Sequence, residues 1–101
     1  MVNYPEKETY TYEDLVHILR ILRAPGGCPW DREQTFESLR NNTIEETYEL
    51  VDAIADHNMD GIREELGDLL LHVVFYSKLG EEAGAFDFAD VANAECDKLI
   101  Y

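Results

Sequence analysis

The spacing of apolar residues constrains the fold of this chain more than any other feature of the sequence. Apolar residues recur every three or four positions in four segments, which are residues 11–23, 43–56, 61–82 and 87–100. This spacing is typical of amphipathic helices, and no segment alternates as a β-strand would. Residues 25–27, residues 57–60 and Gly84 provide the breaks between the segments. The sequence therefore predicts an all-α fold, a four-helix bundle-like domain with short connections.

Residue types at the segment ends predict where the helices begin. Thr11 with Asp14 has the pattern of a capping box, in which each residue bonds the backbone of the other. Asp60 is the expected N-cap of the helix that follows the turn near residue 57. A short helical stretch capped by Asp31 is expected to be interrupted at Asn41–Asn42.

The length and charge of the chain limit its organisation and partners. At 101 residues it has the size of a single domain, residues 1–101, with residues 1–10 expected to form a loose lead-in. The 22 acids and 8 bases give a net charge of −14, which argues against binding to nucleic acid polymers or to an anionic membrane. Two cysteines outside a CxxC pattern, and a start without signal-peptide features, predict a reduced, cytoplasmic protein.

Acidic residues are concentrated in the middle of the chain. Residues 45–68 contain nine acids and one base, Arg63. Part of this charge is explained by an amphipathic helix with a solvated face. The apolar positions on one side of that helix are 44, 47, 48, 51, 54 and 55, and the acids on the opposite side are 45, 49, 52 and 56.

Two acids do not fit a solvated face. Glu46 lies on the flank beside Leu50 and Ala53, where an amphipathic helix normally carries an apolar residue. Asp68 lies at the start of residues 66–79, which are apolar on nearly every side and so are expected to be buried. A buried carboxylate is costly unless it is paired, hydrogen-bonded or bound to a metal ion.

The register of a helix hairpin brings these acids together. If the chain turns near residue 57, Glu46 lies opposite Asp68 and Glu49 lies opposite Glu65. Within each helix the two acids are three residues apart, so all four can converge. Four converging carboxylates repel one another without a cation. Oxygen ligands favour Mg²⁺ or Mn²⁺ over zinc, so the sequence predicts a metal-binding helix hairpin.

Four blocks of sequence, in the same order, resemble the MazG-type nucleotide pyrophosphohydrolases of the all-α NTP pyrophosphohydrolase superfamily. The blocks are Gly27-Cys28-Pro29-Trp30-Asp31-x-x-Gln34-Thr35, Glu45-Glu46-Thr47-Tyr48-Glu49, Glu65-Leu66-Gly67-Asp68-Leu69-Leu70 and Asp97-Lys98-Leu99. The second and third blocks match the family signature EExxE…ExxD. The resemblance runs from about residue 12 to the end of the chain.

The resemblance implies hydrolysis of nucleoside triphosphates to the nucleoside monophosphate and pyrophosphate. It implies that Glu46, Glu49, Glu65 and Asp68 are ligands of Mg²⁺, with Mn²⁺ as an alternative. Glu45 and Glu46 are the expected catalytic acids. For Glu45 three roles are open: an outer group behind the ligands, a ligand of a second metal ion, or the base that positions the attacking water.

Other residues could contact the substrate. Trp30 could stack on a nucleobase or pack over the end of the bundle, and Arg32 could contact phosphate. Lys98 and Lys78 are rare cations that could also bind phosphate, although an ordinary solvated lysine explains Lys78 equally well. His72 is expected to hydrogen-bond locally rather than to bind metal.

The long apolar stretch also bears on assembly. One domain of this size has difficulty covering residues 66–79, so we expect a homodimer or homotetramer. The rival interpretation is a non-catalytic acidic helical module that dimerises and binds a partner. Relatives usually continue after the block at residues 97–99 with an Arg-Arg-His-Pro-like stretch, whereas this chain ends at Tyr101, which is compatible with a truncated C-terminus.

Overall fold

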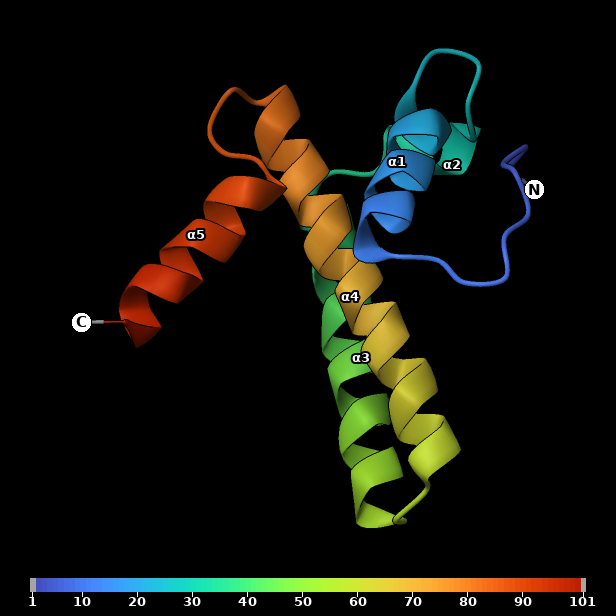
Figure 1. Cartoon of the computed structure of the whole chain (residues 1–101), viewed down its shortest axis with the longest axis vertical. Coiled ribbons are helices and arrows are strands. Elements are labelled where there is room, and N and C mark those ends of the chain that lie inside the picture. The colour runs from blue at the N-terminus through green and yellow to red at the C-terminus, as the bar shows by residue number, and fades with distance from the viewer. Residues whose placement is uncertain (1, 101) are drawn as a thin grey trace.

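The computed structural model of the chain describes residues 2–100 and shows five helices and no strand within that range (Figure 1). The helices are α1 (Tyr12–Arg23), α2 (Pro29–Glu33), α3 (Phe36–Ala55), α4 (Met59–Glu82) and α5 (Phe88–Leu99). The prediction of an all-α fold is therefore confirmed. Helices α3 and α4 form a long antiparallel hairpin, and α1 and α5 pack against α4.

The start of α3 differs from the prediction. The helix begins at Phe36 and continues through Asn41–Asn42 to Ala55, so the predicted interruption there is wrong. Thr35 and Ser38 form a reciprocal capping box, in which the side chain of each accepts a hydrogen bond from the backbone N–H of the other. This cap satisfies the first backbone donors of the helix, so the two asparagines fall inside a helix that has already begun.

The turn between α3 and α4 is tighter than predicted. His57 has a φ of 53°, in the left-handed region, and its N–H donates to the carbonyl of Ile54 at 3.1 Å. This bond closes α3 and makes Asn58, not Asp60, the N-cap of α4. The side chain of Asn58 accepts a hydrogen bond from the backbone N–H of Gly61 at 3.0 Å. Because the turn is short, it fixes which residues of α3 lie opposite which residues of α4.

The buried core lies where α1 crosses the hairpin. It is formed by Leu19 of α1, Leu39 of α3, and three residues of α4, which are Val74, Phe75 and Leu79. Leu19 is only 1% exposed. Burying a leucine side chain of this size contributes about 2 kcal/mol to stability. The core therefore anchors one end of the hairpin.

The other end of the hairpin extends beyond the remaining helices (Figure 1). The apolar stripe predicted on α3 faces solvent there in the single chain. Exposed apolar side chains of the hairpin are Ile44, Tyr48, Val51 and Ile54 of α3 and Leu66, Leu70, Leu71 and Val73 of α4. The expectation that residues 66–79 are buried holds only for their second half. The face of α3 that turns toward α4 instead carries the half-buried Glu46 and Leu50 and the buried Ala53.

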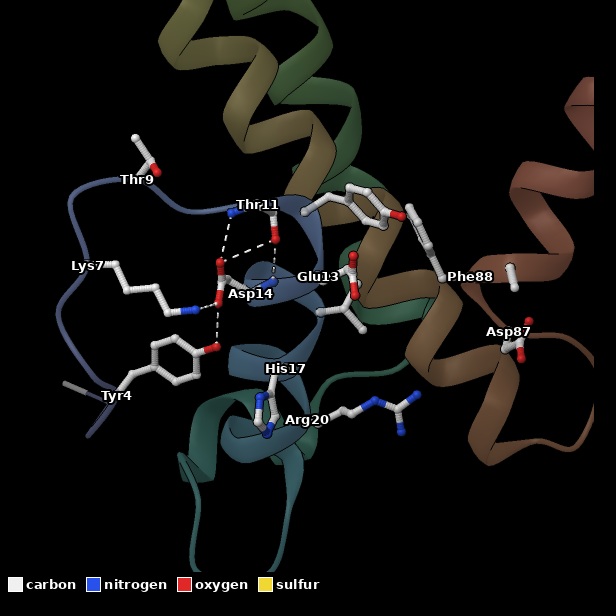
Figure 2. Close-up of a pocket in the computed structure, with 13 residues that line it drawn as sticks. Tyr4, Lys7, Thr9, Thr11, Glu13, Asp14, His17, Arg20, Asp87 and Phe88 are labelled. Carbon is white, nitrogen blue, oxygen red and sulfur yellow. Dashed lines mark hydrogen bonds and ion pairs between the residues drawn. The ribbon is translucent and has the colours of Figure 1, made fainter.

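The segment before α1 has no helix or strand over residues 2–10, yet it is tethered to the rest of the chain. The Tyr4 hydroxyl and the Lys7 ammonium both donate to Asp14 of α1, at 2.7 and 2.6 Å (Figure 2). The predicted capping box between Thr11 and Asp14 is present. Together Lys7, Tyr4 and the Thr11 N–H hold the pKa of Asp14 well below its usual range. An open cavity of about 800 Å³ lies between this segment, α1 and the start of α5.

No helix in residues 2–100 combines the length and apolar character needed to cross a membrane.

Candidate metal centre

Four carboxylates converge on the inner side of the hairpin. They belong to Glu46 and Glu49 of α3 and to Glu65 and Asp68 of α4. One oxygen from each lies within 4.8 Å of the corresponding oxygens of the other three. These are the four residues that the hairpin register predicted to meet. Such a set of oxygens, three half-buried and one exposed, can surround a small cation.

The backbone explains why these four side chains meet. Residues three apart lie on one face of a helix, so each helix offers two acids to the same point. The turn at His57 fixes the register, which places the two pairs at the same level of the hairpin. The side chains project from two long helices rather than from loops, so their positions are set by the scaffold.

Two oxygen atoms of the cluster fit the presence of a cation. Oε2 of Glu46 and Oε2 of Glu65 are buried and have no hydrogen-bond partner among the described residues. Buried polar atoms are normally hydrogen-bonded, and leaving one unpaired costs about 1–3 kcal/mol. A divalent cation would satisfy both oxygens. The donor set consists of carboxylate oxygens only, which suits Mg²⁺ or Mn²⁺.

The electrostatics of the cluster agree with this fit. Burial, together with the negative charges of Asp68 and Glu49, raises the pKa of Glu46 to about 7. Burial and the neighbouring Glu49 also raise the pKa of Glu65. Both shifts mean that a full set of charges is unfavourable in the chain alone. The arginine nearest in sequence, Arg63, is exposed and pairs with Asp60.

The remaining predicted site residues lie outside this cluster. Glu45 is exposed on α3, next to Glu46 in sequence. Trp30 and Arg32 are exposed on the short helix α2, with Trp30 at 58%. Lys78 pairs with Glu81 at 3.2 Å, ten residues beyond Asp68 and so about 15 Å further along α4.

Lys98 lies on a different helix from the cluster. It is an exposed residue of α5, which packs against α4, and its ammonium lies 3.7 Å from Glu95. Within residues 2–100 the ion pairs of Lys78 and Lys98 are with Glu81 and Glu95, not with the four acids.

A polar network lies one helical turn from the cluster, and it contains His72, which was predicted to hydrogen-bond locally, and Thr43, which sequence reasoning missed. The hydroxyl of Thr43 is 2.6 Å from Nδ1 of His72 and 2.6 Å from the hydroxyl of Tyr76. The ring of Phe36 stacks on Tyr76 with the centroids 5.8 Å apart. His72 is 8% exposed, and burial lowers its pKa. The hairpin register could have identified Thr43, because it places this residue opposite His72.

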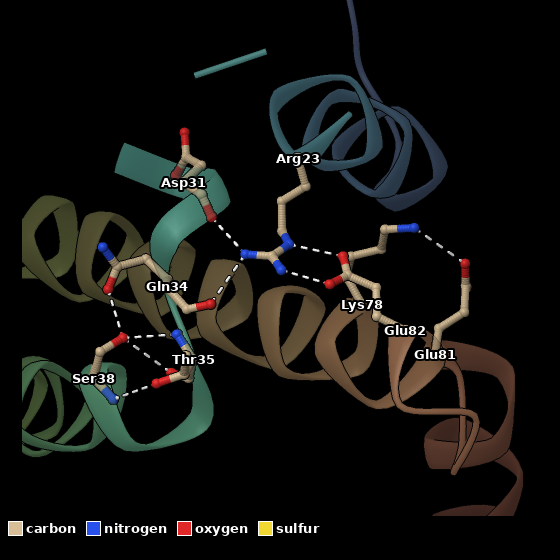
Figure 3. Close-up of polar contacts among 8 residues, drawn as sticks. All are labelled: Arg23, Asp31, Gln34, Thr35, Ser38, Lys78, Glu81 and Glu82. Atoms are coloured by element: carbon tan, nitrogen blue, oxygen red, sulfur yellow. Dashed lines mark hydrogen bonds and ion pairs between the residues drawn. The ribbon is translucent and has the colours of Figure 1, made fainter. Parts of the chain in front are cut away.

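Arg23 is a second residue that the sequence did not single out. Its guanidinium donates to both carboxylate oxygens of Glu82 and to the backbone carbonyls of Asp31 and Gln34 (Figure 3). These contacts join the C-terminal ends of α1, α2 and α4. The Arg23 side chain is 8% exposed, so its role is to hold the helices that flank the core.

Known proteins of one family match this chain. The model of the MazG nucleotide pyrophosphohydrolase domain matches residues 34–101. A nucleoside triphosphate pyrophosphohydrolase of Escherichia coli K12 is 54% identical over 86 residues, which cover 84% of this chain and 33% of the relative. The nucleoside triphosphate pyrophosphohydrolase/pyrophosphatase MazG of Thermotoga maritima is 52% identical over 89 residues, covering 88% and 35%.

A nucleoside triphosphate pyrophosphohydrolase of Mycolicibacterium smegmatis is 48% identical over 88 residues, which cover 85% of this chain and 26% of the relative. The chain thus spans about a third or less of the length of these curated relatives. The matched region contains both acidic motifs and the whole hairpin. The chain therefore belongs to the MazG nucleotide pyrophosphohydrolase domain family.

Proposed function

We propose that this chain hydrolyses nucleoside triphosphates between the α and β phosphates, releasing the nucleoside monophosphate and pyrophosphate. The proposal includes Mg²⁺, with Mn²⁺ as an alternative, held by Glu46, Glu49, Glu65 and Asp68. The observation that carries it is the convergence of these four carboxylates within 4.8 Å, with two buried oxygens that have no partner among the described residues. The names of the relatives, nucleoside triphosphate pyrophosphohydrolases, support the substrate class.

In the proposed reaction the cation and the protein would have different roles. A bound cation would offset the charge of the phosphates and polarise the bond to be cleaved. The four ligands hold that charge at one place on a rigid hairpin, which favours a defined orientation of the triphosphate. Glu45, exposed and next to Glu46 in sequence, is proposed to act as an outer group behind the ligands, as a ligand of a second metal ion or as the base that positions the attacking water.

The net charge of −14 supports a requirement for metal. A triphosphate is strongly anionic, and the cluster adds four further carboxylates at the site. Without a cation the substrate and the site repel each other. Trp30, Arg32, Lys78 and Lys98 remain predictions as substrate contacts, as does a cytoplasmic location.

We also propose that the chain forms a homodimer or homotetramer. The support is the number of exposed apolar side chains on the hairpin, which include Ile44, Tyr48, Val51, Leu66 and Leu70, each between 40% and 67% exposed. Exposed apolar side chains in this number are typical of a surface that another subunit covers. Sedimentation equilibrium on the chain tests it: a monomer at micromolar concentration would contradict the proposal.

The activity is tested by measuring pyrophosphate release from a panel of nucleoside triphosphates, with MgCl₂ and with EDTA. We expect release that depends on metal, and the ranking of the panel then defines base and sugar preference. Release that continues unchanged in EDTA would contradict the proposed metal site.

A chain that releases no pyrophosphate and whose melting temperature does not respond to Mg²⁺ would instead favour the rival function, a non-catalytic acidic helical module. A ligand that binds the folded state raises the melting temperature. The two functions are therefore separated by one titration and one assay on the same sample.

A further inference from the structure

The hydrogen bonds around Thr43 constrain where the protons lie. The Thr43 hydroxyl has three neighbours, which are the carbonyl of Leu39 at 3.0 Å, Nδ1 of His72 and the hydroxyl of Tyr76. A threonine hydroxyl has one proton to donate and can accept two hydrogen bonds. A carbonyl oxygen only accepts, so the Thr43 proton must go to Leu39 if all three bonds are made.

This arrangement selects one tautomer of His72. With the Thr43 proton on the Leu39 carbonyl, Tyr76 O–H and His72 Nδ1–H must both donate to Thr43 Oγ1. Because burial lowers the pKa of His72, the ring is neutral near pH 7 and carries one proton. If all three bonds to Thr43 are made, that proton is on Nδ1 and Nε2 has a free lone pair.

The ring is also held in place by its neighbours. Tyr76 lies edge-on to His72, with the ring centroids 6.2 Å apart and the planes at 88°. Phe36 in turn stacks on Tyr76. Nε2 of His72 has no hydrogen-bond partner among residues 2–100, yet it is not among the fully buried atoms without a partner, which are two glutamate oxygens. Nε2 is therefore within reach of solvent.

The position of His72 relates this lone pair to the acidic cluster. His72 lies four residues after Asp68, on the same face of α4. Helical side chains lean toward the N-terminus of their helix, and for His72 this direction leads to Asp68. Thr43 lies three residues before Glu46 on α3, so both members of the pair adjoin the cluster.

We propose that His72 is a positioning residue of the metal centre: Thr43 holds its ring as the Nδ1–H tautomer, and Nε2 accepts a hydrogen bond from a water molecule beside Glu46 and Asp68. This inference rests on the proposed metal site. The chemical reason is that Mg²⁺ prefers six ligands and usually keeps some waters, while the cluster supplies four carboxylates. The protons of such a water need acceptors, and the unprotonated Nε2 of a neutral histidine is one.

The first test is the tautomer of His72 in the full chain labelled with ¹⁵N histidine. Long-range ¹H–¹⁵N spectra distinguish a protonated from an unprotonated ring nitrogen, and His17 and His57 serve as internal references. We expect a protonated Nδ1 and an unprotonated Nε2 for His72 in EDTA. The opposite tautomer, or rapid averaging between the two, would overturn the inference and leave the proposed function intact.

The second test adds MgCl₂ alone to the same sample. We expect the ¹⁵N shift of His72 Nε2 to move as it accepts a hydrogen bond, while Nδ1 keeps its shift. Calorimetry measures Mg²⁺ binding in parallel. If Mg²⁺ binds and Nε2 does not respond, the inference is wrong; if Mg²⁺ does not bind at all, the proposed function fails and the inference fails with it.

Matched variants test the role of Thr43. Thr43→Val removes the hydroxyl at nearly constant volume, and we expect it to release the tautomer and to weaken Mg²⁺ binding about 10-fold. Thr43→Ser keeps the hydroxyl and should bind Mg²⁺ like the wild type. Equal affinity in the two variants would contradict the proposed role.

His72 itself is tested by a conservative pair. His72→Gln can still donate to Thr43 and accept from water, whereas His72→Leu can do neither. We expect His72→Gln to retain most of the Mg²⁺ affinity that His72→Leu loses. Far-UV circular dichroism confirms that both variants fold, and a merely structural role would predict no such rescue of metal binding.

Discussion

The two ends of α4 place acidic side chains in opposite surroundings. Near the C-terminal end, Glu81 pairs with Arg20 at 2.9 Å. Glu82 is bound by the Arg23 guanidinium (Figure 3). These hydrogen bonds from arginine lower the pKa of both glutamates. The C-terminal end of α4 therefore favours charged acids and gains stability from them.

The N-terminal half of α4 does the reverse. Glu65 and Asp68 face two further acids of α3, and burial with like charge raises the pKa of Glu65 and of Glu46. Helix α4 thus pairs Glu81 and Glu82 with arginines, while Glu65 and Asp68 face only other acids. The cluster therefore differs from an ordinary acidic surface, because its buried oxygens on Glu46 and Glu65 have no base beside them among the described residues, whereas the more exposed Glu81 and Glu82 do.

The largest expected effect is on turnover. Glu49→Gln or Asp68→Asn removes one charged ligand, and we expect pyrophosphate release to fall by more than about 100-fold while the helical content is unchanged. Pyrophosphate assays and circular dichroism measure the two quantities. The matched control is Asp52→Asn, an exposed acid on α3 outside the cluster, which should keep its activity. Wild-type turnover in either ligand variant would show that the ligand assignment is wrong.

The next effect is on stability, from removing an arginine–glutamate pair at the C-terminal end of α4. Arg23→Met removes the donor to Glu82 and to two backbone carbonyls, and we expect the free energy of unfolding to fall by about 2–3 kcal/mol. Arg20→Met is the control, because Arg20 is exposed and its pair with Glu81 should contribute less than about 1 kcal/mol. Urea unfolding measures both. Equal losses would mean that burial of the arginine does not matter.

The third effect is the pH dependence of stability. The pKa of Glu46 is raised from an ordinary value of 4.5 to about 7 in the folded chain. Deprotonation therefore costs more in the folded than in the unfolded state, and stability is lost as pH rises from about 4.5 to about 7. In EDTA we expect the melting temperature to fall by a few degrees over this range. Mg²⁺ should reverse the fall.

Glu46→Gln isolates this contribution, because it keeps the shape of the side chain and cannot ionise. We expect the variant in EDTA to be more stable than the wild type at about pH 8 and to show little difference at about pH 5. His72, whose pKa is lowered, titrates in both proteins and cancels in the difference. A wild-type advantage at pH 8 in EDTA would contradict the repulsion within the cluster.

The smallest effect concerns the segment before α1. Tyr4→Phe removes one hydrogen bond to the buried Asp14, and we expect a loss of about 1 kcal/mol in the free energy of unfolding. Tyr12→Phe removes an exposed hydroxyl and keeps the ring stacked on Phe88, so it should be close to neutral. Urea unfolding again provides the measurement. If Tyr4→Phe were neutral as well, the Tyr4 hydroxyl would not contribute to holding the segment.

Local patterns predicted the helices and, more unusually, the meeting of the acids. Glu46 with Glu49 and Glu65 with Asp68 repeat at helical spacing, and a short turn between two helices leaves little freedom in register. The errors in the helices were at their boundaries, and the expected burial of residues 66–79 failed in the first half of that stretch. The Thr35–Ser38 cap and the left-handed His57 moved two helix starts, because backbone hydrogen bonds at a turn decide these positions within a few residues.

The sequence by itself determined the all-α class, the hairpin and the four acids that face one another, because helices form from local spacing and a tight turn sets the register. Only the tertiary structure decided which faces are covered. The stripe of Tyr48 and Val51 is exposed while Glu46 is turned inward, a choice made by how α4 packs against α3. It also decided that Thr43 and His72 lie within hydrogen-bond distance, since contacts between helices depend on distances that no single helix specifies.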